Sequence, residues 1–580
     1  MYKILISQFK QYKKAALLTP VFTGLEALME LLILFITAKI IDEGIQAGNL
    51  SRVYFYGGIM LVMAFLSLCL GVLAGKNAAE ASSGFACNLR NQMYENIQTF
   101  SFSNIDKFST AGLVTRMTTD VTNVQNAVQM VLRIASRAPL MLILSMGMCF
   151  LINARLSVIF LVAIVVLAGA LYVIMSKTTV IFRQVFRRYD DLNAEVQENV
   201  TAIRVVKAFV REEHEVGKFK QAAQKLYDLS VRAEARLAFN NPVMMLVIYG
   251  CMIALSWFGA KHIVIGDLTT GELTSMFSYV MSMMMSLMML SMVFVMIAMS
   301  AASCNRIAEV LEEKPDLTNP EAPVMEVDDG RIDFNHVSFS YKHGSGEETL
   351  HDIDFHVEAG ETIGIIGGTG CGKSSLVNLI SRLYDVDEGQ VLVGGRDVRT
   401  YDMEALRNQV AVVLQKNVLF SGTILDNLRW GKEDATEEEC KEVCRQACAD
   451  DFIEGFPDGY NTWIEQGGTN VSGGQKQRLC IARALLKRPK VLILDDSTSA
   501  VDTATDSRIR EAFRKKIPGT TKIIIAQRIS SVQDADRIMV LEDGQINGFD
   551  THENLLKTNK IYQEIYETQQ KGGGDFDQPS

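Results

Sequence analysis

The hydrophobic residues of the first 300 positions gather into six long stretches separated by polar connections. Each stretch has about 20 or more mainly apolar residues, which is the length that crosses a hydrocarbon layer roughly 30 Å thick. The stretches lie near residues 16–41, 53–74, 127–152, 156–176, 242–266 and 272–300. The pattern therefore predicts an all-α domain with six membrane-spanning helices.

The basic residues between these stretches predict the orientation of the helices. Two long connections, 75–126 and 177–241, carry 16 Lys and Arg between them, and residues 1–14 carry four. The other three connections are short and carry one basic residue or none: 42–52, 153–155 and 267–271. Because basic loops remain on the cytoplasmic side, both termini and both long connections are expected in the cytoplasm. The long connections contain few helix breakers and are predicted to be helical.

Two pairs of charged residues lie inside predicted spans. Glu26 and Glu30 are one helical turn apart in the first span, and Arg133 and Arg137 are one turn apart in the third. Ionisable residues inside a membrane are costly unless they are paired or face water. Two interpretations follow: an ion pair between helices, or a water-filled cavity in which a glutamate attracts a cationic ligand.

The sixth span is rich in methionine, with nine Met from 281 to 299. Met is flexible and polarizable, and it suits surfaces that accept varied ligands. These positions surround the whole helix, so many of them are expected to face lipid or neighbouring helices instead of a ligand.

After residue 311 the pattern changes to short β-type runs that alternate with helices, which is typical of an α/β domain. The predicted boundaries are 1–311 for the membrane domain, 312–330 for an acidic linker, 331–570 for the α/β domain and 571–580 for a disordered tail. Residues 301–580 contain 31 Lys and Arg against 48 Asp and Glu. Nucleic-acid binding is not expected, because the half that is predicted to be soluble is negative.

The α/β domain contains a glycine-rich loop between a strand and a helix. Gly367, Gly372, Lys373 and Ser374 fit the pattern G-x-x-x-x-G-K-S. In that pattern backbone N–H groups wrap phosphates, the lysine reaches the β- and γ-phosphates, and the serine ligates Mg²⁺. The residues expected to hold the nucleotide are Gly367, Gly368, Thr369, Gly370, Cys371, Gly372, Lys373, Ser374 and Ser375. Cys371 is interpreted as a small residue tolerated in this loop, with redox control of nucleotide binding as the alternative.

Two further motifs accompany this loop. The run KVLILDD (490–496) has the form of a Walker B strand, whose Asp495 would hold Mg²⁺ through water. Ser472, Gly473 and Gly474 precede a helix and form a second phosphate-binding helix end. Two chains that face each other head to tail would use both ends, because each chain would then complete the nucleotide site of the other.

The whole chain resembles an ABC transporter half of the exporter type, with six spans fused to one ATPase domain. The resemblance implies that Tyr341 stacks on adenine and that Gln415 is the glutamine that senses Mg²⁺, with Ser374 and Asp495 as the other metal-binding residues. It also identifies Ser472, Gly473, Gly474 and Gln475 as the signature, with Val471 in place of the usual Leu. Asp502, in SAVD (499–502), matches the D-loop, and Glu465 stands one position earlier than the usual X-loop glutamate.

The sequence departs from this family at two catalytic positions. The residue after the Walker B aspartate is usually Glu and is here Asp496, and the usual switch histidine is here Gln527. Aspartate is one methylene shorter, and glutamine cannot carry a positive charge or exchange a proton as histidine can. The two changes together predict a degenerate site that binds ATP and Mg²⁺ and hydrolyses ATP poorly.

An intact signature beside a weak site predicts a heterodimer with a homologous half-transporter, in which this chain completes the partner's hydrolytic site. This arrangement resembles bacterial heterodimeric multidrug exporters in the plasma membrane, and the expected substrate is a lipophilic or amphipathic small molecule. The alternatives are an exporter of a specific peptide or lipid, a homodimer that uses Asp496 as a slow base, and a channel or regulatory subunit.

Overall fold

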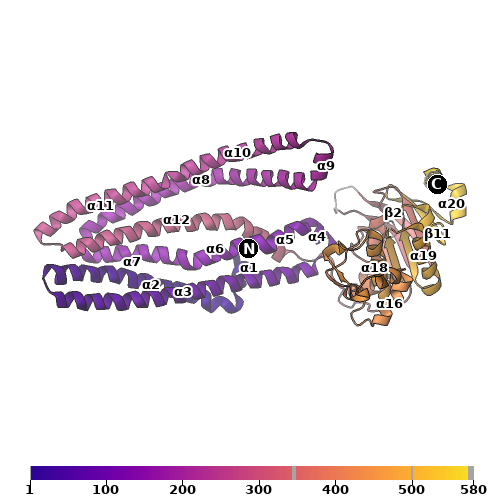
Figure 1. Ribbon diagram of the computed structural model, residues 1–580, viewed down its shortest axis with the longest axis horizontal. Helices are drawn as coiled ribbons and strands as arrows, with labels where there is room; N and C mark the ends of the chain where they lie inside the picture. Colours follow the sequence, from indigo (N-terminus) through magenta and orange to yellow (C-terminus); the bar gives the residue numbers. More distant parts are fainter. Residues whose placement is uncertain (1, 342–347, 498–500, 573–580) are drawn as a thin grey trace. The chain divides into compact units, whose positions relative to one another are not determined.

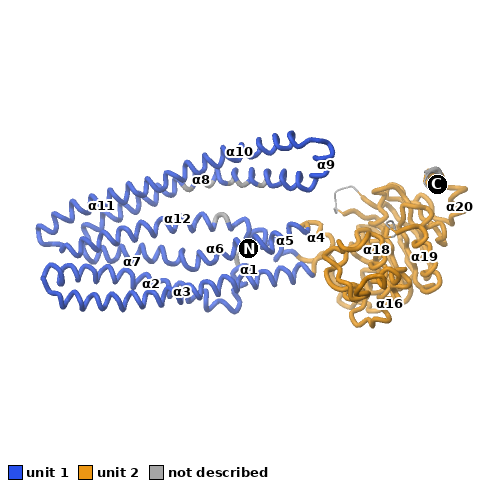
Figure 2. The backbone as a smooth tube through the Cα atoms, viewed as in Figure 1, with its two compact units in different colours: residues 1–98, 110–313 blue, residues 99–109, 314–580 orange. Residues whose placement is uncertain are grey.

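The computed structural model describes residues 2–341, 348–497 and 501–572 and divides into two compact units (Figure 2). Unit 1 comprises Met1–Gln98 and Thr110–Glu313, and unit 2 comprises Thr99–Ser109 and Lys314–Ser580. Ser499 and Ala500 of the D-loop motif lie outside the described residues, as does the predicted disordered tail from residue 573 onward.

Unit 1 is a bundle of long helices (Figure 1). Its helices are α1 (Tyr2–Ser7), α2 (Lys13–Lys39), α3 (Leu50–Thr99), α5 (Thr110–Thr115), α6 (Val121–Met130), α7 (Ser136–Ile152), α8 (Ala154–Thr201), α9 (Ile203–Ala208), α10 (Glu212–Ala238), α11 (Asn240–Ile265) and α12 (Thr270–Glu312). Segments with π-helical hydrogen bonding join some of them: Ile40–Gln46, Arg116–Asp120 and Val131–Ala135.

Six helical stretches in this unit are long and apolar enough to cross a membrane, which confirms the six predicted spans. They are Lys10–Gln46, Leu50–Thr99, Thr110–Ile152, Ala154–Thr201, Glu212–Ile265 and Thr270–Glu312. The single helix α3 has 50 residues, and at about 1.5 Å per residue it is roughly 75 Å long. Such a helix is more than twice as long as a hydrocarbon layer is thick, so the second half of α3 continues the second span into the predicted connection 75–126.

Polar contacts inside the bundle join helices that are distant in sequence. Arg137 on α7 reaches both glutamates of α2, with Nη1 3.2 Å from Glu26 Oε1 and Nη2 2.6 Å from Glu30 Oε2. The helices α2 and α7 are therefore joined by an ion pair, as the first of the two interpretations predicts. Gly71 on α3 leaves room for the Glu26 carboxylate, because a Cβ there would lie 3.0 Å from Glu26 Oε1.

A second polar contact holds α12 at its C-terminal half. Asp120 is buried, and its carboxylate accepts hydrogen bonds from Arg306 Nε at 2.7 Å and from Ser303 Oγ at 2.8 Å. A buried carboxylate loses its hydration, so it depends on these donors. The contact fixes α12 against the π-helical turn that ends at Asp120.

Unit 2 is built on two sheets. Its strands are β1 (Ile332–Phe339), β2 (Leu350–Val357), β3 (Thr362–Gly367), β4 (Glu388–Val393), β5 (Arg396–Asp397), β6 (Val410–Val413), β7 (Gly422–Thr423), β8 (Trp463–Ile464), β9 (Val491–Asp495), β10 (Thr521–Ile525), β11 (Arg537–Glu542) and β12 (Gln545–Asp550). The larger sheet has the order β12-β11-β3-β10-β9-β6, in which all neighbours are parallel except β11 and β12. The smaller antiparallel sheet has the order β2-β1-β4-β5, and β7 pairs with β8.

The larger sheet is covered on both faces, as expected for parallel strands. Every residue of β9 and β10 is buried. Along β9, Val491 and Ile493 belong to the core shared with the smaller sheet, whereas Leu492 and Leu494 pack with α18 on the other side. The helices of unit 2 are α4 (Phe102–Phe108), α13 (Lys373–Ile380), α14 (Met403–Gln409), α15 (Ile424–Arg429), α16 (Glu437–Gln446), α17 (Asp450–Glu454), α18 (Gly473–Leu486), α19 (Thr503–Lys516), α20 (His552–Thr558) and α21 (Lys560–Gly572).

The short helix α4 belongs to unit 2, although it follows α3 of unit 1 directly in the chain. Ser101 and Asn104 form a capping box that starts the helix. Asn104 also donates to the Lys314 carbonyl at 3.2 Å and accepts from the Asp316 N–H at 3.4 Å. The predicted membrane domain includes all of residues 1–311, whereas the structure groups 99–109 with unit 2, where Asn104 contacts Lys314 and Asp316.

The Asp120 contact predicts a loss of stability in Asp120→Ala. The change removes the buried carboxylate that accepts hydrogen bonds from Arg306 and Ser303. Breaking a buried pair costs about 3–5 kcal/mol, and the lower end is expected here because the Arg306 side chain is 45% exposed. The measurement is the thermal unfolding midpoint of the full chain in detergent. Glu511→Gln serves as the control, since it removes an ion pair to Lys515 that is exposed to solvent and contributes little to stability. Equal midpoints for the two variants would contradict the prediction.

Candidate functional site

Four parallel strands of unit 2 end at the same edge of the larger sheet, and each is followed by a residue of the predicted nucleotide site. The glycine-rich loop follows β3, Gln415 follows β6, Asp495 and Asp496 stand at the end of β9, and Gln527 follows β10. Loops at the carboxyl edge of such a sheet are the usual place for ligand binding. The topology therefore brings together residues that are more than 100 positions apart in the sequence.

The glycine-rich loop has the strand–loop–helix setting that the sequence predicts, from β3 to α13. Gly372 has φ +97°, and a Cβ there would lie 2.7 Å from Leu350 Cδ2, so glycine is required on both counts. A Cβ at Gly368 or Gly370 would meet open space, which leaves their backbone accessible to a ligand. Lys373 Nζ donates to the carbonyls of Gly367 at 2.9 Å and Gly368 at 2.6 Å, so its ammonium group lies within the loop.

Ser374 and Asp495 lie side by side below this loop. Asp495 is 6% exposed, and its carboxylate is hydrogen-bonded to the Ser374 hydroxyl. Burial raises the pKa of Asp495, the serine hydrogen bond lowers it, and the neighbouring Asp496 charge raises it again, so that the overall shift is upward. A hydroxyl and a carboxylate placed together are the oxygen ligands that Mg²⁺ prefers. A bound cation at this position would also relieve the burial of the Asp495 charge.

Asp496 is held by amide groups from two neighbouring strand ends. Its Oδ2 accepts a hydrogen bond from Gln527 Nε2 at 2.8 Å, and Gln415 Nε2 lies 3.5 Å from the same oxygen. The backbone N–H of Asp496 donates to the Ile525 carbonyl at 3.0 Å, and its φ is +48°. The two residues that depart from the family pattern are therefore in direct contact with each other.

Gln527 is fixed in turn by Gln569 of α21. Gln569 Nε2 donates to the Gln527 carbonyl at 2.8 Å, and Gln569 Oε1 accepts from the Ile529 N–H at 2.8 Å. No motif or spacing in the sequence marks Gln569, so it is absent from the predicted site residues. Its amide contacts both sides of Arg528 and holds the backbone that carries Gln527.

Tyr341, the residue predicted to stack on adenine, lies close to the glycine-rich loop. It is 46% exposed, and its hydroxyl is 2.9 Å from Ser375 Oγ at the start of α13. Its ring contacts Phe339 at 4.9 Å and Tyr384 at 5.1 Å between centroids. An exposed aromatic face held by neighbouring rings is suited to stacking on a base.

The signature residues form an N-terminal helix cap. Ser472 Oγ accepts from the Gln475 N–H at 3.3 Å, and Gln475 Oε1 accepts from the Ser472 N–H at 2.9 Å. Ser472 and Gly473 are exposed at the start of α18. Within the described part of the chain, the side chains of Ser472 and Gln475 each bond the backbone of the other residue. The signature therefore presents the amino end of a helix to solvent.

The other motif residues are also anchored locally. Asp502 caps α19 by accepting from the Thr505 N–H at 2.9 Å, and this hydrogen bond lowers the pKa of Asp502. Glu465 accepts from Thr469 Oγ1 at 2.8 Å. Cys371 is buried with its Sγ 3.5 Å from Lys373 Nζ. The structure thus brings Lys373, Ser374, Asp495, Asp496, Gln415 and Gln527 into one cluster, with Tyr341 beside Ser375, and gives the signature a separate surface.

Comparison with known proteins agrees with this geometry. Residues 17–303 match the family described as ABC transporter transmembrane region, and residues 350–499 match the family described as ABC transporter. The ABC transporter ATP-binding protein YfiB of Bacillus subtilis is 37% identical over 564 residues, covering 97% of this chain and 98% of that protein. The ATP-dependent lipid A-core flippase of Desulfotalea psychrophila is 34% identical over 487 residues, covering 83% and 82%.

Among solved structures, a bacterial Atm1-family ABC exporter with ATP bound superimposes with a TM-score of 0.82 at 25% identity, covering 97% of this chain and 99% of that one. Both halves of the chain are therefore accounted for by one architecture, a membrane domain fused to an ATPase domain that implies ATP binding, typically with Mg²⁺. This chain belongs to the ABC transporter family, as an ATP-hydrolysing half-transporter of the exporter type.

Proposed function

We propose that this chain is the degenerate-site subunit of a heterodimeric exporter of hydrophobic or amphipathic compounds. In this assignment Lys373, Ser374 and Asp495 bind ATP with Mg²⁺, and the chain hydrolyses that ATP poorly. Its signature, Ser472–Gln475, completes the hydrolytic site of a homologous partner chain. The observation that carries the proposal is the hydrogen bond between Gln527 and Asp496.

Three features of Asp496 and Gln527 support weak catalysis. The amides of Gln527 and Gln415 both approach Asp496 Oδ2, which makes this oxygen less available for orienting an attacking water. The aspartate side chain is one methylene shorter than glutamate, and attack in line with a phosphate tolerates little misplacement. Gln527 uses an amide N–H on Asp496, and its neutral amide offers a γ-phosphate no positive charge. Mg²⁺ held at Ser374 and Asp495 would neutralise phosphate charge.

The exposed cap at Ser472 supports a role on a second chain. A helix amino end binds phosphate through its free N–H groups and its dipole. Ser472 is already placed as a hydrogen-bonding group by the capping box with Gln475. We propose that ATP binding by both chains closes the two ATPase domains, and that segments near 104–114 and 205–216 carry this motion to the membrane. With the basic connections in the cytoplasm, closure exposes the substrate site to the outside.

The substrate assignment rests on one face of α12. Four of its methionines are exposed at helical spacing and form a stripe that consists of Met281, Met285, Met289 and Met292. Others, such as Met283 and Met284, are buried in the core of unit 1. The methionine run thus has two parts, and the exposed stripe has the adaptable apolar surface that varied ligands require. Export of a lipid is the second candidate, and the similarity to the protein named ATP-dependent lipid A-core flippase favours it.

Restoring both catalytic residues is expected to activate this chain by itself. The double variant Asp496→Glu with Gln527→His should raise ATPase activity of the chain alone in lipid by about 100-fold, since a positioned general base contributes about 10²–10⁴-fold. Asp496→Glu alone should gain less, because Gln527 still donates to the carboxylate. Adding Lys373→Ala to the double variant controls for contaminating ATPases and should abolish the gain. Robust activity of the unmodified chain alone would instead indicate a homodimer with Asp496 as a working base.

The donated signature is tested in the mixed assembly with a co-encoded homologous half-transporter. Ser472→Ala should remove most of its ATPase activity, by about 10²-fold or more, because it removes a donor aimed at the transferred phosphate. Asp496→Asn is the matched change on this chain's own site and should leave the activity within about twofold. The reverse pattern would mean that the hydrolytic site belongs to this chain.

A bulkier residue in the methionine stripe tests whether the stripe contacts the substrate. Met285→Trp adds bulk to the exposed stripe and should change the substrate range in an efflux assay with several lipophilic dyes, reducing transport of the larger ones. Met245→Trp on α11 is the control, since Met245 is also exposed but lies outside the stripe. Equal behaviour of both variants and the unmodified chain would assign the stripe to lipid contact.

A further inference from the structure

One tyrosine of unit 2 joins three elements that are otherwise separate in the sequence. Tyr384 lies between α13 and β4, and its hydroxyl donates to Asp106 Oδ2 of α4 at 2.8 Å. Its ring contacts Phe102 of α4 at 6.1 Å and Tyr341 at 5.1 Å between centroids, the latter at an interplanar angle of 89°. Edge-to-face contacts of this kind stabilise the relative position of two rings.

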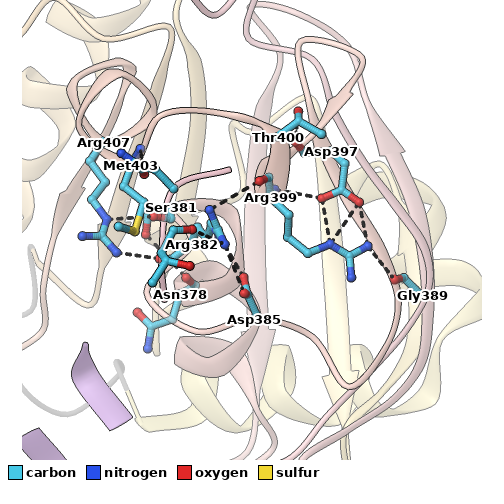
Figure 3. A network of polar contacts seen from close by, with 12 residues as sticks. Asn378, Ser381, Arg382, Asp385, Gly389, Asp397, Arg399, Thr400, Met403 and Arg407 are labelled. Carbon is cyan, nitrogen blue, oxygen red and sulfur yellow. Dashed lines mark hydrogen bonds and ion pairs between the residues drawn. The ribbon is translucent and has the colours of Figure 1, made fainter. Parts of the chain in front are cut away.

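Two arginines hold the backbone of the segment that carries Tyr384, the buried Arg382 and the half-buried Arg407 (Figure 3). Arg382 is buried, adopts φ +50° and pairs with Asp385, with Nε 2.9 Å from Oδ1. Arg407 Nη2 donates to the Arg382 carbonyl at 2.7 Å. Tyr384 is therefore fixed from both sides at the end of the phosphate-binding helix α13. Burial and the Asp106 hydrogen bond both raise the pKa of Tyr384, so its hydroxyl remains a donor at neutral pH.

Within the described residues, the ring and hydroxyl of Tyr341 have two other contacts. Phe339 contacts it from the same strand end, and its hydroxyl meets Ser375 Oγ. Tyr384 is the neighbour that also touches α4, and α4 is joined in the chain to α3 on one side and α5 on the other. A shift of α4 would thus move the Tyr384 hydroxyl, and with it the ring edge against which Tyr341 rests.

We infer that Tyr384 is a positioning residue that couples the placement of α4 to the aromatic platform for the adenine base. The inference rests on the proposed role of Tyr341 as that platform. When Asp106 holds the Tyr384 hydroxyl, the Tyr341 ring is fixed for stacking and ATP binds more tightly. Because such coupling is reciprocal, ATP stabilises the docked position of α4 by the same factor.

The test compares two ligands of the full chain in lipid nanodiscs with Mg²⁺. ATP contacts both the platform and the glycine-rich loop, whereas inorganic tripolyphosphate contacts the loop alone. Tyr384→Ala should weaken ATP binding roughly fivefold, which corresponds to the loss of one aromatic pair. The affinity for tripolyphosphate should remain unchanged. Equal weakening of both ligands would indicate a damaged loop and would overturn the inference.

A double-mutant cycle tests the Asp106 contact. Tyr384→Phe and Asp106→Ala each should weaken ATP about twofold to threefold, and the double variant should be no weaker than either, because both remove the same hydrogen bond. Tyr460→Phe is the matched control, since Tyr460 also donates to an aspartate, Asp450, in the same unit; it should leave both affinities unchanged. Additive losses at Asp106 and Tyr384 would overturn the coupling.

Two further measurements complete the experiment: hydrogen exchange of α4 and the ATP affinity of Tyr341→Ala. ATP should slow exchange of the amides of 102–108 in the unmodified chain and not in Tyr384→Ala. The variant Tyr341→Ala distinguishes failure of the proposed adenine platform from failure of the coupling through Tyr384. If it leaves ATP affinity unchanged, the proposed platform is wrong and the coupling fails with it. If it weakens ATP while the Tyr384 and Asp106 variants do not, only the coupling fails.

Discussion

Strands that run parallel all present their carboxyl ends to one edge of a sheet, and the chemistry of unit 2 depends on that constraint. The ends of β3, β6, β9 and β10 carry the glycine-rich loop, Gln415, the Asp495–Asp496 pair and Gln527. The strands themselves are buried on both faces, so their register is fixed by packing. The side chains that follow these strands are therefore held at defined positions. Gln527 Nε2 lies 2.8 Å from Asp496 Oδ2 for this reason.

The same constraint connects the two departures from the family pattern. Because β9 and β10 are neighbours, the residues that follow them approach each other. In a site with glutamate and histidine, a base and a positively charged partner would occupy this place. Here a neutral amide instead donates a hydrogen bond to a shorter carboxylate. That contact must be broken or shared when the carboxylate turns toward a water molecule.

Much of the architecture could be predicted from the sequence, for physical reasons. A span is recognised by its length of apolar residues, and the glycine-rich loop by residue types that only a phosphate site requires. The placement of α4 could not be predicted in the same way. Its seven residues are held by Asn104 and Asp106, whose partners Lys314 and Tyr384 are more than 200 positions away. The support of Gln527 by Gln569 is likewise a tertiary contact without a sequence signal.

The backbone conformation of Asp496 bears on how this position can change in evolution. Its φ of +48° lies in the left-handed region, which aspartate adopts more readily than residues with longer side chains. Glutamate fits this conformation less well, and a change from Asp496 to Glu would also displace the amide of Gln527, which bonds the shorter side chain. If the site is degenerate as proposed, regaining a glutamate base would therefore require changes at both positions, and two chains that divide binding and hydrolysis between them would remain dependent on each other.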